Sequence, residues 1–235
     1  MKILLWNCNN GISKQIQIDY FKSFDCDLAV IPELKENNIE KLNPSSSIWI
    51  TNNFENKTPK GLGVLGFNNV WLERLPRDED MEIYIPIKVN TSKLNFTLLA
   101  VWNFYWACKQ GRFKDLKGDN CLEWAALEHY KPILKDPSLI IGDWNFGPTF
   151  AQEAFVKLNN ILNEQDIKSL YHEFENIPVT DTKNYTYKSP MKTFHHLDHM
   201  FGSLYFLNKM KNFKISSLDE AILSDHAALL LELDI

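Results

Sequence analysis

The chain has 235 residues, of which 45% are hydrophobic and 23% are charged, a composition typical of a globular protein that buries a sizeable core. Lysine and arginine total 25 against 30 acidic residues, and the net charge of −5 argues against a protein that binds polyanions through overall basicity. The sequence contains no CxxC pair, charge block or apolar run of membrane-spanning length, which indicates a cytoplasmic protein without membrane insertion and one domain over residues 1–235.

The N-terminal stretch predicts a strand, a helix and a second strand. Ile3–Trp6 is a continuous apolar run, which is typical of a strand buried on both faces. Apolar residues then recur at helical spacing between residues 16 and 24, and Leu28–Ile31 is a second apolar run that a proline ends. We therefore expect Asn7 and Glu33 just beyond the ends of two neighbouring strands.

The middle of the chain predicts further strands, at residues 48–51 and 61–67. Met81–Val89 alternates strictly between two sets of side chains, which predicts a half-buried antiparallel strand, and Pro86 favours an edge position for it. Leu94–Trp102 follows as the expected hairpin partner of this strand.

Aromatic and then basic residues follow the expected hairpin, before a helix that ends near residue 131. The segment is either an ordinary solvated loop or a surface on which single-stranded nucleic acid stacks its bases and binds through its phosphates. Under the second interpretation, the possible substrate contacts are Trp102, Asn103, Tyr105, Lys109 and Arg112.

Leu139–Asn145, with the sequence LIIGDWN, is the stretch around which the other candidate residues are arranged. Three branched apolar residues and a glycine predict a short buried strand that stops at polar side chains. Asp143 and Asn145 are therefore expected at the strand end, where open α/β sheets hold their functional residues. Thr149 and Gln152 then predict the start of a helix, with Ala151, Phe155, Leu158 and Leu162 on its apolar face.

The last third again predicts short strands, at residues 185–187, 196–201, 214–218 and 227–233. Asp198 falls inside the second of these strands, and Asp225 and His226 come immediately before the last. Strands and helices thus alternate twice, with hairpins inside each half. This pattern predicts an α/β fold in which two sheets pack as a sandwich with helices outside.

The candidate residues at the strand boundaries are rich in oxygen and include one imidazole: Asn7, Glu33, Asp143, Asn145, Asp198, Asp225 and His226. Mg²⁺ and Mn²⁺ prefer carboxylate, amide and water oxygens, whereas Zn²⁺ would recruit more histidine or cysteine. His226 can exchange a proton near neutral pH, and Asp198 could orient its ring. This set of side chains suits the attack of water on a phosphate ester.

The segment HHLDH offers an alternative metal site. Strand alternation puts His196 and Asp198 on one face and His195 and His199 on the other, which disfavours a compact three-histidine zinc site. We expect His195 and His199 to be packed or surface residues.

Five segments resemble, in this order, the motifs of the endonuclease/exonuclease/phosphatase superfamily: WNCNNG at residues 6–11, IPEL at 31–34, GDWN at 142–145, HLDHMF at 196–201 and SDHAAL at 224–229. The match spans nearly the whole chain. The resemblance implies a four-layer α-β-β-α sandwich of two mixed β-sheets flanked by helices. It also implies a metal-dependent phosphoesterase, with Mg²⁺ (or Mn²⁺) as cofactor, that hydrolyses phosphodiester bonds in nucleic acid.

The same resemblance implies roles for the candidate residues. The implied metal ligands are Glu33, Asn7 and Asp225. The implied phosphate-binding residues are Asn7, Asn145 and His226. The implied catalytic residues are Asp143, His226, Asp198 and Asn145. Asp143 and Asn145 would orient the attacking water, Asp198 would support His226, and the general base is either Asp143 or His226.

Two positions depart from the pattern of the superfamily. Pro32 stands where glutamine usually precedes the glutamate, and Trp102 stands about where family members present a histidine or tyrosine to the phosphate. Tryptophan has a single N–H donor and cannot titrate, so either a neighbour such as Asn103 or Tyr105 substitutes or catalysis is altered. Two alternative hypotheses follow: a phosphatase or phosphodiesterase that acts on a small molecule or lipid headgroup, and a catalytically weakened module that binds nucleic acid or nucleotides.

Overall fold

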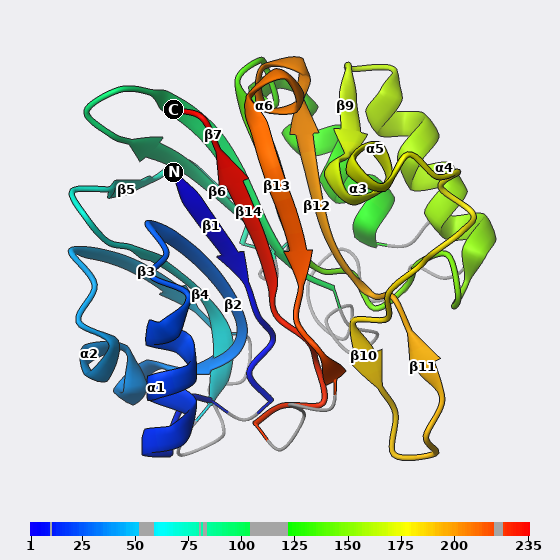
Figure 1. Ribbon diagram of the computed structural model, residues 1–235. Helices are drawn as coiled ribbons and strands as arrows, with labels where there is room; N and C mark the ends of the chain where they lie inside the picture. Colours follow the sequence, from blue (N-terminus) through cyan, green and yellow to red (C-terminus); the bar gives the residue numbers. More distant parts are fainter. Residues whose placement is uncertain (10, 52–58, 80, 82–83, 104–121, 219–222) are drawn as a thin grey trace.

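The structure is a computed structural model, and it describes residues 1–9, 11–51, 59–79, 81, 84–103, 122–218 and 223–235. Within these residues the strands form two six-stranded sheets and one two-stranded sheet (Figure 1). The first large sheet consists of β1 (Lys2–Leu5), β2 (Leu28–Lys35), β3 (Ser46–Ile50), β4 (Lys60–Gly66), β13 (Met210–Ile215) and β14 (Leu229–Leu233). Their order is β13-β14-β1-β2-β4-β3, and β1 and β2 are the parallel neighbours.

The second large sheet consists of β5 (Trp71–Arg74), β6 (Tyr84–Asn90), β7 (Asn95–Trp102), β8 (Ser138–Asp143), β9 (Ile167–Ser169) and β12 (Asp198–Ser203). Their order is β5-β6-β7-β8-β12-β9, and β7 and β8 are the parallel neighbours. The two-stranded sheet is a hairpin of β10 (Tyr187–Lys188) and β11 (Phe194–His195), which projects from the lower end of the molecule in Figure 1.

The α-helices are α1 (Gln15–Ser23), α2 (Ile39–Leu42), α3 (Leu122–Tyr130), α4 (Gln152–Asn163), α5 (Leu170–Glu175) and α6 (Leu204–Lys209). Short 3₁₀ turns at Glu36–Asn38 and Lys131–Ile133 precede α2 and follow α3. None of the helices in the described part of the chain has the length and apolar character needed to cross a membrane.

Alternate residues of the central strands pack on opposite faces of each sheet, and this alternation builds the layers. Residues that pack between the two sheets include Ile3, Leu5, Val30, Leu98, Ala100 and Ile141. Residues that pack between the first sheet and α1 or α2 include Leu4, Trp6, Ile18, Phe21 and Leu42. Residues that pack between the second sheet and α3 or α4 include Leu99, Val101, Ile140, Leu127 and Phe155. The order of layers is therefore helix, sheet, sheet, helix, which confirms the predicted four-layer sandwich of two mixed sheets.

Strand β2 does not end where the proline interrupts its apolar run, as the sequence predicted, but continues to Lys35. A bulge accommodates the proline, which has no N–H to donate: the pairing with β4 shifts register between Ile31 and Leu34, and Glu33 has a φ of 62°. Glu33 therefore lies within a bulged strand rather than beyond a strand end.

Strand β6 is an interior strand, between β5 and β7, and the predicted edge position is wrong. It is also more buried than expected, because Tyr84 and Pro86 are covered as well as the alternate set. Pro86 accepts a hydrogen bond from the N–H of Leu75 at 3.0 Å, so its backbone polar atoms face β5. The missing N–H of Pro86 therefore interrupts no pairing with β7. It also interrupts no pairing with β5, because β5 has already ended at Arg74.

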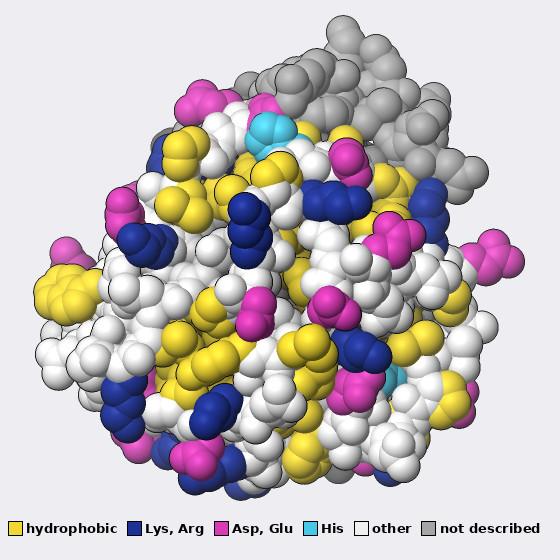
Figure 2. All heavy atoms as spheres, turned by 90° about the horizontal axis from the view of Figure 1, so that it is seen from above, with side chains coloured by type: hydrophobic (Ala, Val, Ile, Leu, Met, Phe, Trp, Pro, Cys, Tyr) yellow, Lys and Arg dark blue, Asp and Glu magenta, His cyan; other side chains and the backbone are white. Residues whose placement is uncertain are grey.

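The two parallel strand pairs end at the same side of the sandwich, which is the lower end in Figure 1. Asn7 follows β1 and Asp198 begins β12 at this end, and Asp143, the last residue of β8, pairs with Asp198. Figure 2 shows the opposite end from above, where basic and acidic side chains are interspersed over the described part of the surface. The polar residues that follow the strands are therefore gathered at the lower end of the sandwich.

Candidate active site

Asn7 joins the two sheets at the lower end of the sandwich. Its Nδ2 atom donates to Asp143 Oδ2 at 3.0 Å and lies 3.4 Å from Glu33 Oε1, and its Oδ1 atom accepts from the N–H of Asn9 at 3.1 Å. Asn7 and Asp143 are buried, whereas Glu33 is half-buried. Residues from three distant segments therefore meet at one amide group.

Glu33 reaches this site because of the bulge in β2. The left-handed backbone at Glu33 is unfavourable for a residue with a Cβ atom and costs about 1–2 kcal/mol, so the surrounding pairing of β2 must hold it. The second carboxylate oxygen, Oε2, forms an ion pair with Lys60 Nζ, which comes from the first residue of β4. Glu33 thus contacts an amide on one side and an ammonium group on the other.

Asp143 is held by the turn that follows β8. Asn145 adopts a φ of 54°, its N–H donates to Asp143 Oδ1 at 3.0 Å, and its Nδ2 atom lies 3.3 Å from Asp143 Oδ2. The same Nδ2 atom donates to the carbonyl oxygen of Asn103. This turn fixes the carboxylate and leaves Asn145 half-buried at the rim of the site.

Asp198 and His226 form a buried pair next to Asp143. Asp198 Oδ2 and His226 Nδ1 are 2.8 Å apart, and the N–H of Asp198 donates to Thr186 Oγ1 at 3.1 Å. Ser224 supports the histidine from the other side, because its Oγ atom accepts from the N–H of His226 at 3.1 Å and donates to the carbonyl oxygen of Asn7 at 2.6 Å. The hydrogen bonds of Ser224 therefore join the segment of His226 to the end of β1.

The three buried residues Asp143, Asp198 and His226 each offer a ligand atom, and these atoms lie within 4.8 Å of one another. Burial and the nearby charge of Asp198 raise the pKa of Asp143 to about 7. Burial alone would lower the pKa of His226, but the charge and hydrogen bond of Asp198 outweigh it and raise this pKa to about 10. Asp198 thus favours the protonated form of both neighbours, and it makes His226 the more basic of the two.

Two further predicted residues, Asp225 and Trp102, lie around the cluster of Asp143, Asp198 and His226. Asp225 is half-buried, and its charge raises the pKa of both His226 and Tyr187, so its carboxylate lies near the site. Trp102 ends β7 opposite Asp143 and packs against the core between the sheets.

Asn103 has a structural role in the described contacts. Its N–H donates to the carbonyl oxygen of Asp143 at 2.8 Å, and its Nδ2 atom donates to the carbonyl oxygen of Trp144 at 3.1 Å. It therefore holds the backbone of the turn after β8. Tyr105, Lys109 and Arg112 lie outside the described residues.

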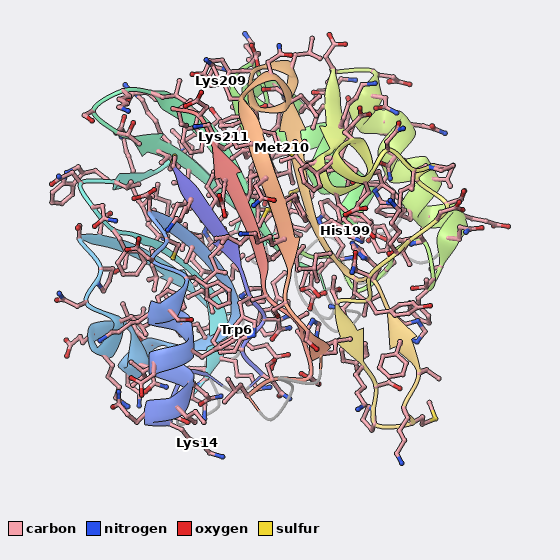
Figure 3. All side chains as sticks on the ribbon, viewed as in Figure 1. Trp6, Lys14, His199, Lys209, Met210 and Lys211 are labelled. Atoms are coloured by element: carbon pink, nitrogen blue, oxygen red, sulfur yellow. The ribbon has the colours of Figure 1, made fainter. Side chains whose placement is uncertain are left out.

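His195 and His199 of the HHLDH segment do not contact the pair of Asp198 and His226 in the described structure. Figure 3 shows His199 on β12 at the side of the α4 and α5 helices, and its ring stacks on Phe155 with centroids 4.4 Å apart. Its Nε2 atom is 2.9 Å from the carbonyl oxygen of Phe146. His195 lies on β11, 3.3 Å from the carbonyl oxygen of Thr149. The structure thus separates both side chains from the pair formed by Asp198 and His226.

Sequence reasoning missed the residues that support the site. Thr186 binds the backbone of β12, and the ring of Tyr187 lies 4.7 Å from the ring of His226. Burial, together with the charges of Asp225, Asp143 and Glu33, raises the pKa of the Tyr187 hydroxyl. Trp6, labelled near the lower end of β1 in Figure 3, donates from Nε1 to the carbonyl oxygen of His226 at 3.3 Å. A short predicted strand at residues 185–187 was the available signal for Thr186 and Tyr187.

The donor set fits a divalent cation that prefers oxygen ligands. Carboxylates from both sheets converge on Asn7, and the other oxygen of Asp198, Oδ1, is buried without a hydrogen-bond partner among the described residues. His226 Nδ1 is occupied by Asp198, so the histidine contributes no further nitrogen from that side. Glu33, Asn7 and the nearby Asp225 could hold such an ion, and Asp143 and Asp198 lie close enough to one another to offer further oxygens.

The sequence matches no protein-family model and no curated protein. Its structure is similar to three solved structures over 100% of this chain and 100% of theirs. These are an AP endonuclease from Archaeoglobus fulgidus (14% identity, TM-score 0.71), a 3′ phosphatase, NExo, from Neisseria bound to a product DNA hairpin (15%, 0.63), and an endonuclease/exonuclease/phosphatase family protein from Leptotrichia buccalis C-1013-b (12%, 0.66). At this level of identity the likeness establishes the fold, which is the endonuclease/exonuclease/phosphatase fold that the sequence motifs implied.

Proposed function

We propose that the chain hydrolyses phosphate esters with the help of a divalent cation, Mg²⁺ or Mn²⁺, and that its substrate is a phosphodiester bond in nucleic acid. The observation that carries the proposal is the hydrogen bonding of Asn7 to both Glu33 and Asp143 beside the pair of Asp198 and His226. Acidic oxygens that could hold a cation thus lie beside a protonated imidazole that could bind phosphate. The similar folds of an AP endonuclease and of NExo, which is bound to DNA, support nucleic acid as the substrate.

The protonation states assign roles to the two candidate bases. His226 is protonated at neutral pH, so it can donate a hydrogen bond to a phosphate oxygen but cannot accept the proton of water. Burial and the charge of Asp198 raise the pKa of Asp143 toward neutrality, so its carboxylate is the better acceptor of that proton. A bound divalent cation would neutralise charge on the phosphate and on the leaving oxygen. Asp143 is therefore the proposed general base.

The other residues position these groups. Asp198 orients the His226 ring and keeps it charged, and Asn145 holds Asp143 through two hydrogen bonds. Glu33, Asn7 and Asp225 are the proposed metal ligands of the site, and Asn7, Asn145 and His226 are the proposed phosphate-binding residues.

A substrate panel with and without EDTA tests this function. The panel contains duplex DNA, abasic DNA, RNA, nucleotides, inositol phosphates and bis-p-nitrophenyl phosphate. We expect EDTA-sensitive cleavage of a nucleic acid, and a loss of about 10³-fold in rate for Asp143→Asn or His226→Gln with an unchanged circular dichroism spectrum. Full activity in either variant, or in EDTA, would contradict the proposal.

The net charge of −5 favours a second candidate, a phosphatase or phosphodiesterase that acts on a small phosphorylated molecule or lipid headgroup. Cleavage of only the small substrates in the same panel would select it.

The position of Trp102, packed against the core, favours a third candidate, a module that binds nucleotides or nucleic acid without turnover. Binding without turnover in Mn²⁺ would select that one.

A further inference from the structure

Lys60 is a cationic residue of the site that no sequence motif indicated. Its Nζ atom forms an ion pair with Glu33 Oε2, and the two side chains are 34% and 19% exposed. The other oxygen of Glu33 lies beside the Nδ2 atom of Asn7. The carboxylate proposed to bind the metal is therefore already in contact with a positive charge of the protein.

The fold holds the backbone of Lys60 in place. Thr51 Oγ1 donates to the carbonyl oxygen of Lys60 at 2.6 Å, and Lys60 pairs with Lys35 across β4 and β2. The next residue, Gly61, allows a close approach, because a Cβ atom there would lie 2.3 Å from the carbonyl oxygen of Ile50. The close packing of β4 on β3 thus places Lys60 opposite the bulge that carries Glu33.

The charges around this pair indicate what the lysine does. Among the described residues, the acidic side chains at the site are Glu33, Asp143, Asp198 and Asp225, and the basic ones include Lys60 and His226. His226 is paired with Asp198, and Lys60 is paired with Glu33. A divalent cation that binds Glu33 must use the same carboxylate and must approach an ammonium group of like charge.

We propose that Lys60 is an internal counter-ion of Glu33 that competes with the divalent cation, so that metal binding displaces the ammonium group from the carboxylate. This inference rests on the proposed function, because it takes Glu33 as a metal ligand. Without metal, Lys60 relieves the repulsion among the carboxylates. With metal, the released ammonium group is free to face the phosphate of a substrate. Lys60 thereby sets the concentration of metal at which the site fills.

Titration calorimetry of Mn²⁺ into the purified full chain tests the inference without any activity assay. We expect Lys60→Met and Lys60→Gln to bind Mn²⁺ at least about tenfold more tightly than the wild type, because both remove the competing charge. Lys60→Arg keeps the charge and should retain the affinity of the wild type to within about threefold. The matched control is Lys2→Met, which removes an ion pair with Asp25 from the opposite end of the same sheet and should change nothing.

A thermal melt gives a second readout. Without metal the two neutral variants should melt at a lower temperature than the wild type, and Mn²⁺ should raise their melting temperature by a larger amount. Unchanged or weaker Mn²⁺ binding in both neutral variants would overturn the inference. Glu33→Gln distinguishes a failure of the proposed metal site from a failure of the role of Lys60. If this variant binds Mn²⁺ as tightly as the wild type, Glu33 is not a ligand and the proposed metal site fails. If it abolishes binding while the Lys60 variants behave as wild type, only the role of Lys60 fails.

Discussion

The hydrogen bond between Asp198 and His226 determines which residue of the site can give a proton and which can take one. The two atoms are 2.8 Å apart and both side chains are buried, so the carboxylate stabilises the imidazolium form. Asp143 faces the opposite influence, because burial and Asp198 both favour its protonated form. One carboxylate thus makes its histidine neighbour a stronger base and its aspartate neighbour a weaker acid.

Replacement of Asp198 should therefore move the alkaline limit of activity. The protonated His226 is the proposed phosphate donor, so the rate of the wild type should fall as pH rises through about 10. Asp198→Asn removes the negative charge that raises the pKa of His226, so this pKa falls. The rate of the variant should therefore decline at a pH at least about one unit lower than that of the wild type. The measurement is kcat/KM against pH in saturating Mg²⁺.

A merely structural role for Asp198 would give a different result. It would lower the rate equally at every pH, with the alkaline limit unchanged. That outcome would contradict the role of Asp198 in holding the charge of His226. Circular dichroism of the variant at each pH separates a shift in protonation from unfolding.

At the scale of elements, the close contact of β7 and β8 is what holds Asp143 in place. A Cβ atom at Gly142 would lie 1.8 Å from the carbonyl oxygen of Val101, which is backbone and cannot move alone. Gly142→Ala should therefore force the parallel strands apart and lower the free energy of unfolding by about 3 kcal/mol or more, as measured by urea titration.

Gly63→Ala is the matched control for this substitution. A Cβ atom at Gly63 meets the end of the Leu34 side chain at 2.5 Å, and that side chain can change rotamer. Its effect on the free energy of unfolding should be clearly smaller. Equal losses in the free energy of unfolding in the two variants would show that the close approach of the β7 backbone does not exclude a side chain at position 142.

Strand β12 and helices α4 and α5 enclose three buried histidines, which predicts a loss of stability in acid. Burial lowers the pKa of His172 and of His196 to about 4, and lowers that of His199 well below its usual value. Between pH 6.5 and 4 the unfolded chain therefore binds more protons than the folded one. The stabilising contribution is complete above pH 6.5 and is lost as pH falls toward 4, by about 3 kcal/mol for His196.

Urea unfolding at pH 7.5 and pH 5 measures this effect. His199→Phe removes one titrating ring while keeping an aromatic side chain against Phe155, so the difference in stability between the two pH values should shrink. Phe201→Leu removes no titratable group and should lower stability equally at both. If His199→Phe left the difference unchanged, the ring of His199 would not contribute to it.

Elements were easier to predict than the exact position of a side chain within them. The buried run Leu28–Ile31 falls on β2, Ile3–Leu5 of the first run falls on β1, and Tyr84–Val89 of the alternating run falls on β6, because burial of apolar residues dominates their structure. The bulge at Glu33 could not be read in the same way, because it depends on the pairing of β2 with β4. Pro86 was misplaced for a similar reason, since its tolerance depends on where β5 ends.

The residues of the candidate site likewise include some that local sequence predicts and some that it does not. Acidic and amide residues beside recognisable segments, such as Asp143 in GDWN, could be selected from the sequence alone. Lys60 and Tyr187 could not, because nothing in their own segments marks them. Each becomes part of the site only through a partner far away in the chain, Glu33 for the lysine and His226 for the tyrosine. Such contacts follow from the register of strands and not from local pattern.

At the scale of the whole molecule, charge limits how nucleic acid can bind. The net charge is −5, and the end of the sandwich seen in Figure 2 intersperses basic with acidic side chains over its described surface. In the described part of the chain, the site at the other end has more carboxylates than cationic groups. A phosphate backbone is therefore repelled from the site unless a cation is bound there.

Binding of an oligonucleotide should consequently depend on the metal more than on salt. In the inactive variant Asp143→Asn, a fluorescently labelled DNA should bind at least about tenfold more tightly in Mn²⁺ than in EDTA, as measured by anisotropy at fixed ionic strength. The dependence on monovalent salt should be shallow if the described part of the site binds the DNA, because its cationic side chains there, Lys60 and His226, are already paired with Glu33 and Asp198. Equal affinity in Mn²⁺ and EDTA together with a steep salt dependence would mean that a basic surface, and not the metal site, holds the nucleic acid. Glu33→Gln in the same background distinguishes the two, since it should remove the effect of Mn²⁺ while leaving binding to any basic surface intact.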